Sequence, residues 1–217
     1  MHIYQLPISL YSFKLRLAIK LKGLQIELRT PPGGTYRSAE FRRINPAGTI
    51  PALIDGALIL SETDAIIEYL EERGLGQPLF PIDLRQRARM RLLSRWNDLR
   101  LEPAIRQLFP HVSPAARDSA FVASVDSRIG EALALIEGLL DAGGSFATGK
   151  TPGMADCGLM ASLVWLEALT APMMIGTRLG ERFSALMRSM SGHGAIASEV
   201  SVYRKLLQAW VSERSQP

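Results

Sequence analysis

Cysteine is nearly absent from this chain of 217 residues, and its scarcity narrows the possible classes of protein. The single cysteine, Cys157, excludes an internal disulfide and is typical of a reducing compartment. The three histidines, His2, His111 and His193, lack the spacing of metal ligands. No G-x-S-x-G turn and no phosphate-binding loop occurs either. We therefore expect no metal site, no disulfide framework and no nucleotide-binding motif.

The chain also lacks a block of one charge and a long uninterrupted hydrophobic run. The net charge of +4 is spread along the sequence, so nucleic acid is not an expected partner. No basic stretch precedes the first apolar residues, so no secretory signal is read. The most apolar segment, Met154 to Ile175, is interrupted by Asp156, Glu167 and Pro172. The clean run between its two acidic residues is far below the ~20 residues that a membrane helix needs. We expect a buried core helix there, no membrane association and a cytoplasmic location.

The first 72 residues show a mixed pattern of strand and helix signals. Strand signals lie at residues 2–6 and 25–29, and helical signals at 10–23 and from Ser38 to before Pro46. A hairpin centred on Asp55-Gly56 and a helix from Glu62 to Glu72 follow. The resulting order, β-α-β-α-β-β-α, is that of a thioredoxin-like α/β domain.

The remainder of the chain carries only helical signals. We expect helices from Asp83 to about Leu101 and over residues 115–140, 154–169, 180–190 and 202–211. Turn-forming residues before this region indicate a linker. The sequence thus predicts a thioredoxin-like domain over residues 1–76, a linker over 77–84 and an all-α helical-bundle domain over 85–217. Asp156 is expected to hold the first turn of the core helix.

The most informative stretch lies around Pro51. A proline that opens a strand leaves one hydrogen-bonding position open, and a cis bond there would turn the Ile50 N–H and C=O outward, toward a peptide-like ligand. Ser61 and Asp64 loosely resemble a capping box, which would place Glu62 and Thr63 in the first helical turn. The N-terminus of a helix offers N–H groups and partial positive charge, which suit a carboxylate.

This combination resembles the glutathione-binding half of soluble glutathione transferases. The matching residues are Asn45-Pro46, Gly48, Ile50-Pro51, Leu53, Gly56, Leu60, Glu62-Thr63 and Ala65-Ile66, with Thr63 where serine is commoner. The resemblance implies the glutathione transferase fold, glutathione as co-substrate and a homodimer. It also implies that Ile50, before Pro51, pairs through its backbone with the cysteinyl part. Glu62 would hold the γ-glutamyl amino group and Thr63 its carboxylate; Arg37, Arg42 or Arg43 would hold the glycyl carboxylate.

A transferase must also ionise a thiol whose ordinary pKa is ~8.5, and a hydroxyl that donates a hydrogen bond to sulfur favours the thiolate. The segment after the first strand resembles the pattern S-x-x-x-x-[KR]-x-R-[LI]-A of serine-type bacterial, zeta and tau groups. Its register, set by Lys14 and Arg16, places the catalytic serine on Ser9. Ser12, one helical turn on, is the second candidate, and Tyr4 fits the tyrosine-type groups less well.

The implied reaction is the attack of glutathione thiolate on a small hydrophobic electrophile, as in detoxification. Its pocket would lie between the domains, lined by residues near Tyr11 and from Ala88 to Leu108. A glutathione-dependent isomerase resembling maleylacetoacetate isomerase, or a dehalogenase, would use the same site. A non-catalytic module that keeps the fold and binds protein partners is an alternative of another class. The sequence does not choose the electrophile.

Overall fold

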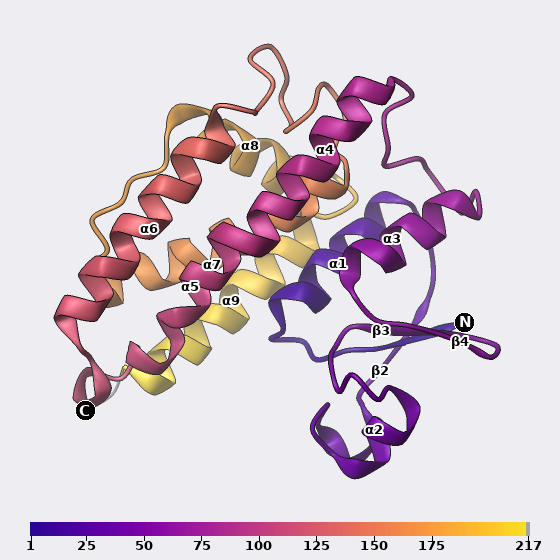
Figure 1. The fold of residues 1–217 in the computed structure, drawn as a ribbon, viewed down its shortest axis with the longest axis horizontal. Helices are drawn as coiled ribbons and strands as arrows, with labels where there is room; N and C mark the ends of the chain where they lie inside the picture. Colours follow the sequence, from indigo (N-terminus) through magenta and orange to yellow (C-terminus); the bar gives the residue numbers. More distant parts are fainter. Residues whose placement is uncertain (216–217) are drawn as a thin grey trace. The chain divides into compact units, whose positions relative to one another are not determined.

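The computed structural model describes residues 1–215 and divides the chain into two compact units, Met1–Phe80 and a second unit that begins at Pro81. Both are drawn in Figure 1. The division falls inside the segment 77–84. The domain limits expected at residues 76 and 85 stay a prediction.

The first unit is built on a four-stranded mixed sheet with the strand order β2-β1-β3-β4. The strands are β1 His2–Tyr4, β2 Glu27–Arg29, β3 Ala52–Asp55 and β4 Leu58–Leu60. Strand β1 runs parallel to β2 and antiparallel to β3, and β3 pairs with β4 as a hairpin. The hairpin turns at Gly56, whose φ of +61° favours glycine. The Asp55-Gly56 turn signal is therefore confirmed.

Three helices cover this sheet. Helices α1 (Leu10–Leu21) and α3 (Thr63–Glu72) pack together on one face, and α2 (Ala39–Ile44), after a short 3₁₀ turn at Pro32–Gly34, lies on the other (Figure 1). Ile3 and Leu53 of the sheet, with Ile66 and Ile67 of α3, are fully buried. The element order confirms the thioredoxin-like prediction.

Two local predictions in this unit were wrong. The strand expected over 25–29 forms only at 27–29, and all three of its side chains are exposed, because β2 is an edge strand. Helix α3 begins at Thr63, one residue later than expected, and its N-cap is Glu62 rather than Ser61. The cause is the backbone of Glu62, whose φ of 70° and ψ of 114° place it outside the helix.

The second unit is helical. Its α-helices are α4 Leu84–Trp96, α5 Glu102–Gln107, α6 Ser119–Glu137, α7 Met154–Met173, α8 Glu181–Gly192 and α9 Ala197–Arg214. A π-helical segment, Asn97–Leu101, joins α4 to α5, and single 3₁₀ turns lie at Phe109–His111 and Pro114–Ala116. Between residues 81 and 215 the only strand-like pairing is an isolated bridge between Phe146 and Gly149. This confirms the all-α prediction, although α9 is longer than expected.

Helix α7 forms the centre of the second unit. Every residue from Met154 to Leu166 is buried, including Cys157. Within the described part of the chain it is the one helix long and apolar enough to cross a membrane, and 78% of its most apolar window is buried inside the protein. Burial of this extent is typical of the core helix of a globular domain, as the sequence predicted.

The start of α7 is closed by a carboxylate of its own. Asp156 is completely buried, and its oxygens accept hydrogen bonds from the N–H groups of Gly153 at 2.8 Å and Ala147 at 2.7 Å. Loss of solvent raises the pKa of Asp156 from 3.8 to about 6, although these hydrogen bonds act in the opposite direction. The structural role expected for Asp156 is therefore confirmed.

Candidate functional site

Three segments with predicted ligand contacts leave the sheet of the first unit at the same edge. Strand β1 ends with Tyr4 paired to Ala52, the first residue of β3, and Leu53 pairs with Leu60, the last residue of β4. After Leu60 the chain passes through Ser61 and Glu62 directly into α3, and Ile50 and Pro51 lie directly before β3. The fold therefore brings the start of β3 and the start of α3, 11 residues apart in sequence, to the same end of the sheet.

The peptide groups of Ile50 are available at this edge. The Ile50–Pro51 bond is cis, and Ile50 is only half-buried. Within residues 1–215, neither the N–H nor the C=O of Ile50 has a hydrogen-bond partner. Most backbone groups inside a fold are paired, so an unpaired N–H and C=O on one residue provide a matched donor and acceptor for a peptide-like ligand.

The start of α3 is open in a similar way. Glu62 supplies no side-chain cap to the helix, and its exposed carboxylate has no partner in the described part of the chain. Thr63 is buried, and its hydroxyl donates to the carbonyl of Tyr11 at 3.5 Å, which joins the start of α3 to the first turn of α1. The first N–H groups of a helix lack intrahelical acceptors and carry partial positive charge, so this end suits a carboxylate.

The two candidate serines occupy different environments in the first turn of α1. Ser9 is the N-cap, and its Oγ accepts the N–H of Ser12 at 3.3 Å. Because a hydroxyl accepts and donates at once, the Ser9 proton stays available to an acceptor outside the helix. Ser12 is 1% exposed, and its Oγ has no hydrogen-bond partner among residues 1–215. Exposure therefore favours Ser9 as the group that reaches a ligand from solution.

Sequence reasoning missed one ionic contact beside these residues. Lys14 of α1 lies 2.6 Å from an Oδ1 oxygen of Asp64 in the first turn of α3, and the Lys14 side chain is fully buried. Lys14 had served only to set the register of the serine motif. The clue available in the sequence was a lysine on one amphipathic helix and a carboxylate on another, which identifies a pair only when the packing of the two helices is known.

The remaining predicted contacts are less defined. Arg37, Arg42 and Arg43 are exposed around α2, and Arg37 lies over the ring of Tyr36, 5.5 Å from its centroid. Nothing in their surroundings selects one of them. No group of three or more histidine, cysteine or acidic side chains that could hold a metal occurs within the described residues. The chemistry at hand is hydrogen bonding and charge.

Known proteins resemble this chain in sequence and in fold. Residues 3–78 match the family described as Glutathione S-transferase, N-terminal domain. Maleylacetoacetate isomerase of Pseudomonas aeruginosa is 32% identical over 181 residues, which cover 77% of this chain and 82% of that protein. Glutathione S-transferase 1 of Dianthus caryophyllus is 37% identical over 90 residues, and the matched part is about two fifths of the length of either chain (41% of each).

A solved structure extends the likeness to the whole fold. The structure of maleylacetoacetate isomerase from Methylobacterium extorquens AM1 with bound malonate and GSH has a TM-score of 0.74 and 27% identity, and the match covers 94% of this chain and 97% of that one. The match therefore includes both the sheet-based unit and the helical unit. Together with the isomerase of P. aeruginosa, matched over most of its length, it shows that this chain belongs to the glutathione transferase family.

Proposed function

We propose that this protein is a glutathione transferase that directs the thiolate of glutathione at small hydrophobic electrophiles. Ile50, held by Pro51, pairs through its backbone with the cysteinyl residue. Glu62 binds the γ-glutamyl amino group, and Thr63, with its N–H, binds the γ-glutamyl carboxylate. The observation that carries the proposal is the unpaired peptide of Ile50 at the sheet edge where the uncapped α3 begins.

In this proposal Ser9 is the catalytic residue and acts on the thiol. Its hydroxyl donates a hydrogen bond to the glutathione sulfur and stabilises the thiolate, which lowers the thiol pKa and raises the fraction of nucleophile at neutral pH. Each unit of lowering corresponds to ~1.4 kcal/mol of preference for the thiolate. The N-terminal end of α1, which Ser9 caps, adds a favourable partial charge to the same sulfur.

A second reaction of the same site is glutathione-dependent isomerisation. The similarity to the maleylacetoacetate isomerase of P. aeruginosa favours it. In such a reaction the thiolate adds reversibly to a conjugated double bond, the adduct rotates and glutathione leaves, so the thiol-activating group and the tripeptide contacts are unchanged. The electrophile contacts expected near Tyr11 and over 88–108 stay a prediction, as does dehalogenation.

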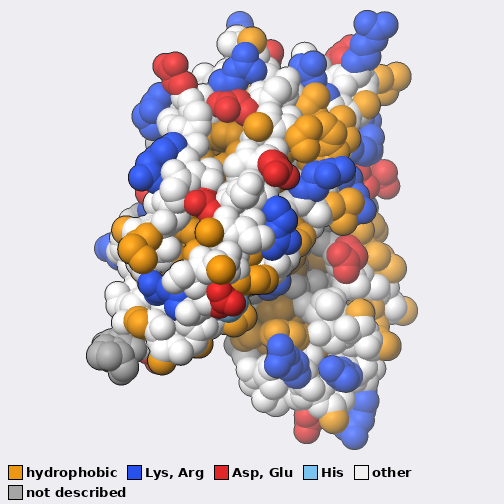
Figure 2. Space-filling view, turned by 60° about the vertical axis from the view of Figure 1, so that its left-hand side comes forward, with side chains coloured by type: hydrophobic (Ala, Val, Ile, Leu, Met, Phe, Trp, Pro, Cys, Tyr) orange, Lys and Arg blue, Asp and Glu red, His pale blue; other side chains and the backbone are white. Residues whose placement is uncertain are grey.

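We further propose a homodimer in the cytoplasm. The second unit exposes large apolar side chains at its start and in the π-helical segment after α4, with Ile82 95%, Leu84 76% and Leu99 61% exposed. Exposed apolar surface of this kind is typical of a protein interface. On the face drawn in Figure 2, cationic and anionic side chains are interspersed. The free thiol of Cys157 fits a reducing compartment, and the proposed role is detoxification.

The catalytic assignment is tested by comparing two serines three residues apart. In a conjugation assay with an aryl halide, Ser9→Ala should lower kcat/KM by about 100-fold, the effect of removing one hydrogen bond to a developing anion. Ser12→Ala is the matched control. It should change kcat/KM by less than about threefold, because the buried Ser12 hydroxyl is not expected to contact the ligand. A loss confined to Ser12→Ala would transfer the catalytic role to that residue.

The reaction type is tested with the same proteins. Wild type is assayed in parallel for conjugation of the aryl halide and for isomerisation of maleylacetoacetate. Turnover of either substrate that requires glutathione and falls in Ser9→Ala supports an enzyme and names its chemistry. Absence of both activities, together with no retention on immobilised glutathione, would favour the non-catalytic, partner-binding module.

A further inference from the structure

Two buried lysines, one within α1 and one at its C-cap, make ion pairs with two carboxylates on α3. Lys14 lies 2.6 Å from Asp64 at the N-terminal ends of the two helices, and Lys22 lies 2.5 Å from Glu71 at their C-terminal ends. The spacings, eight residues on α1 and seven on α3, are each about two helical turns. The pairs therefore lie on one line along the contact between two helices that run in the same direction.

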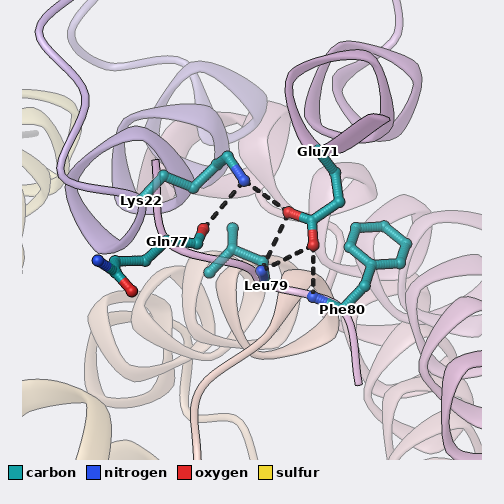
Figure 3. A network of polar contacts seen from close by, with 5 residues as sticks. All are labelled: Lys22, Glu71, Gln77, Leu79 and Phe80. Atoms are coloured by element: carbon teal, nitrogen blue, oxygen red, sulfur yellow. Dashed lines mark hydrogen bonds and ion pairs between the residues drawn. The ribbon is translucent and has the colours of Figure 1, made fainter. Parts of the chain in front are cut away.

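The pair at the C-terminal ends has an evident structural role. Lys22 also donates to the carbonyl of Gln77 at 3.0 Å, and Glu71 accepts the N–H groups of Leu79 and Phe80 (Figure 3). Every hydrogen-bonding partner drawn around this pair belongs to the chain that follows α3. Lys22–Glu71 thus binds residues 77–80 to helices α1 and α3, and it lies about two helical turns from the candidate site.

The pair at the N-terminal ends has a different setting. Asp64 lies in the first turn of α3, directly after Thr63, where the ligand carboxylate is proposed to bind. A carboxylate in the first turn stabilises a helix, but its charge also opposes the binding of a second anion there. The ammonium group of Lys14, buried and 2.6 Å away, cancels that charge without occupying the exposed end of the helix.

We propose that Lys14 is a positioning residue of the glutathione site, which neutralises Asp64 so that the start of α3 stays attractive to the γ-glutamyl carboxylate. This inference rests on the proposed function. It assigns Lys14 no contact with the ligand, because the Lys14 side chain is fully buried. It separates the two ion pairs by role: Lys14–Asp64 sets the charge of the site, and Lys22–Glu71 sets the stability of the first unit.

The experiment measures dissociation constants by calorimetry for two probes, reduced glutathione and 4-aminobutyryl-cysteinylglycine, which keeps the amino group but lacks the γ-glutamyl carboxylate. Lys14→Met should weaken glutathione about tenfold, equivalent to ~1.4 kcal/mol, and change the affinity for the second probe by less than about twofold. Lys14→Arg should restore wild-type affinity for glutathione. Thermal unfolding of each variant is recorded alongside.

A second variant, which should strengthen rather than weaken glutathione binding, distinguishes an effect of charge from damage to the fold. Asp64→Asn removes the Asp64 charge and leaves the Lys14 charge in place, so glutathione should bind about threefold more tightly, whereas general damage to α3 would weaken binding. The double variant Lys14→Met/Asp64→Asn should return to within about threefold of wild type. The matched control is Lys22→Met, which removes an equally buried lysine and should lower the Tm while leaving both affinities within about twofold of wild type.

The outcomes distinguish this inference from the proposed function. Wild type that binds glutathione, with Lys14→Met weakening both probes equally or neither, overturns the role of Lys14 alone. Weaker glutathione binding by Asp64→Asn, or an equal loss in Lys22→Met, does the same. Wild type without measurable affinity for glutathione overturns the proposed function and this inference together.

Discussion

Helices α3 and α7 begin in opposite ways, and the difference separates a binding site from a folding element. At α7 a carboxylate of the first turn, Asp156, is completely buried and accepts the N–H groups of the N-cap Gly153 and of Ala147, which ties the helix start to the chain before it. At α3 the cap residue, Glu62, turns its carboxylate to solvent and leaves the helix end uncapped. A closed N-terminus stabilises the unit that contains it, and an open one is available to an anion from solution.

The largest expected effect comes from removing the Asp156 carboxylate at the start of α7. Asp156→Ala leaves two buried N–H donors without acceptors, at ~1–3 kcal/mol each, and should lower the free energy of unfolding by about 4 kcal/mol. Denaturant titration of the second unit's fluorescence checks this. Asp83→Ala is the control, since Asp83 caps α4 at an exposed site and should contribute only ~1 kcal/mol. Equal losses in the two variants would contradict the special role of Asp156.

The closed end should also respond to pH. The folded-state pKa of Asp156, about 6, lies above its ordinary 3.8, so the folded protein holds the proton more tightly. The contribution of Asp156 to the free energy of unfolding is complete below pH ~3.8. It declines as pH rises to ~6, a loss of about 3 kcal/mol. The measurement is the difference between wild type and Asp156→Asn across this range. A difference that does not vary with pH would show that Asp156 titrates normally.

At the open end the expected effect is on ligand binding rather than stability. Glu62→Ala removes the group proposed to hold the γ-glutamyl amino group and should weaken glutathione about tenfold, or ~1.4 kcal/mol. Because the Glu62 carboxylate has no partner within residues 1–215, the Tm should stay within about 2 °C of wild type. Retention on immobilised glutathione and a thermal melt together decide this. A large fall in Tm with unchanged retention would show that Glu62 stabilises the fold and does not bind glutathione.

The smallest expected effect comes from relieving the backbone conformation of Glu62. The φ of 70° at Glu62 is rare for a residue with a side chain, and glycine adopts it freely. Glu62→Gly should therefore raise the unfolding free energy by about 1 kcal/mol while losing affinity for glutathione, a gain in stability with a loss of function. Chemical denaturation compares it with Glu62→Ala, which keeps the strain. If Glu62→Gly is the less stable of the two, the backbone of Glu62 is not strained.

These two helix starts also show what the sequence could and could not predict. The capping role of Asp156 was predictable, because its partner Gly153 lies three residues away and the interaction is local. The Asp55-Gly56 hairpin was predictable for the same reason. The conformation of Glu62 was not, and the local pattern suggested Ser61 as the cap, because the positive φ is imposed by how the chain turns from β4 into α3.

Contacts between residues far apart in the sequence could not be predicted from the sequence pattern. The partners in the Lys14–Asp64 and Lys22–Glu71 pairs lie about 50 residues apart, and which lysine meets which carboxylate depends on the packing of α1 against α3. The exposure of β2 depends likewise on its place at the sheet edge. The motif register favoured Ser9 over Ser12, but the difference in burial between the two serines could be read only from the structure.

The most direct test is a crystal structure of the protein with glutathione. The account predicts the γ-glutamyl carboxylate within ~3 Å of the Thr63 N–H and the cysteinyl residue paired through its backbone with Ile50. It also predicts the sulfur within hydrogen-bonding distance of the Ser9 hydroxyl. Glutathione bound elsewhere, or bound here with its γ-glutamyl carboxylate directed away from the start of α3, would contradict it.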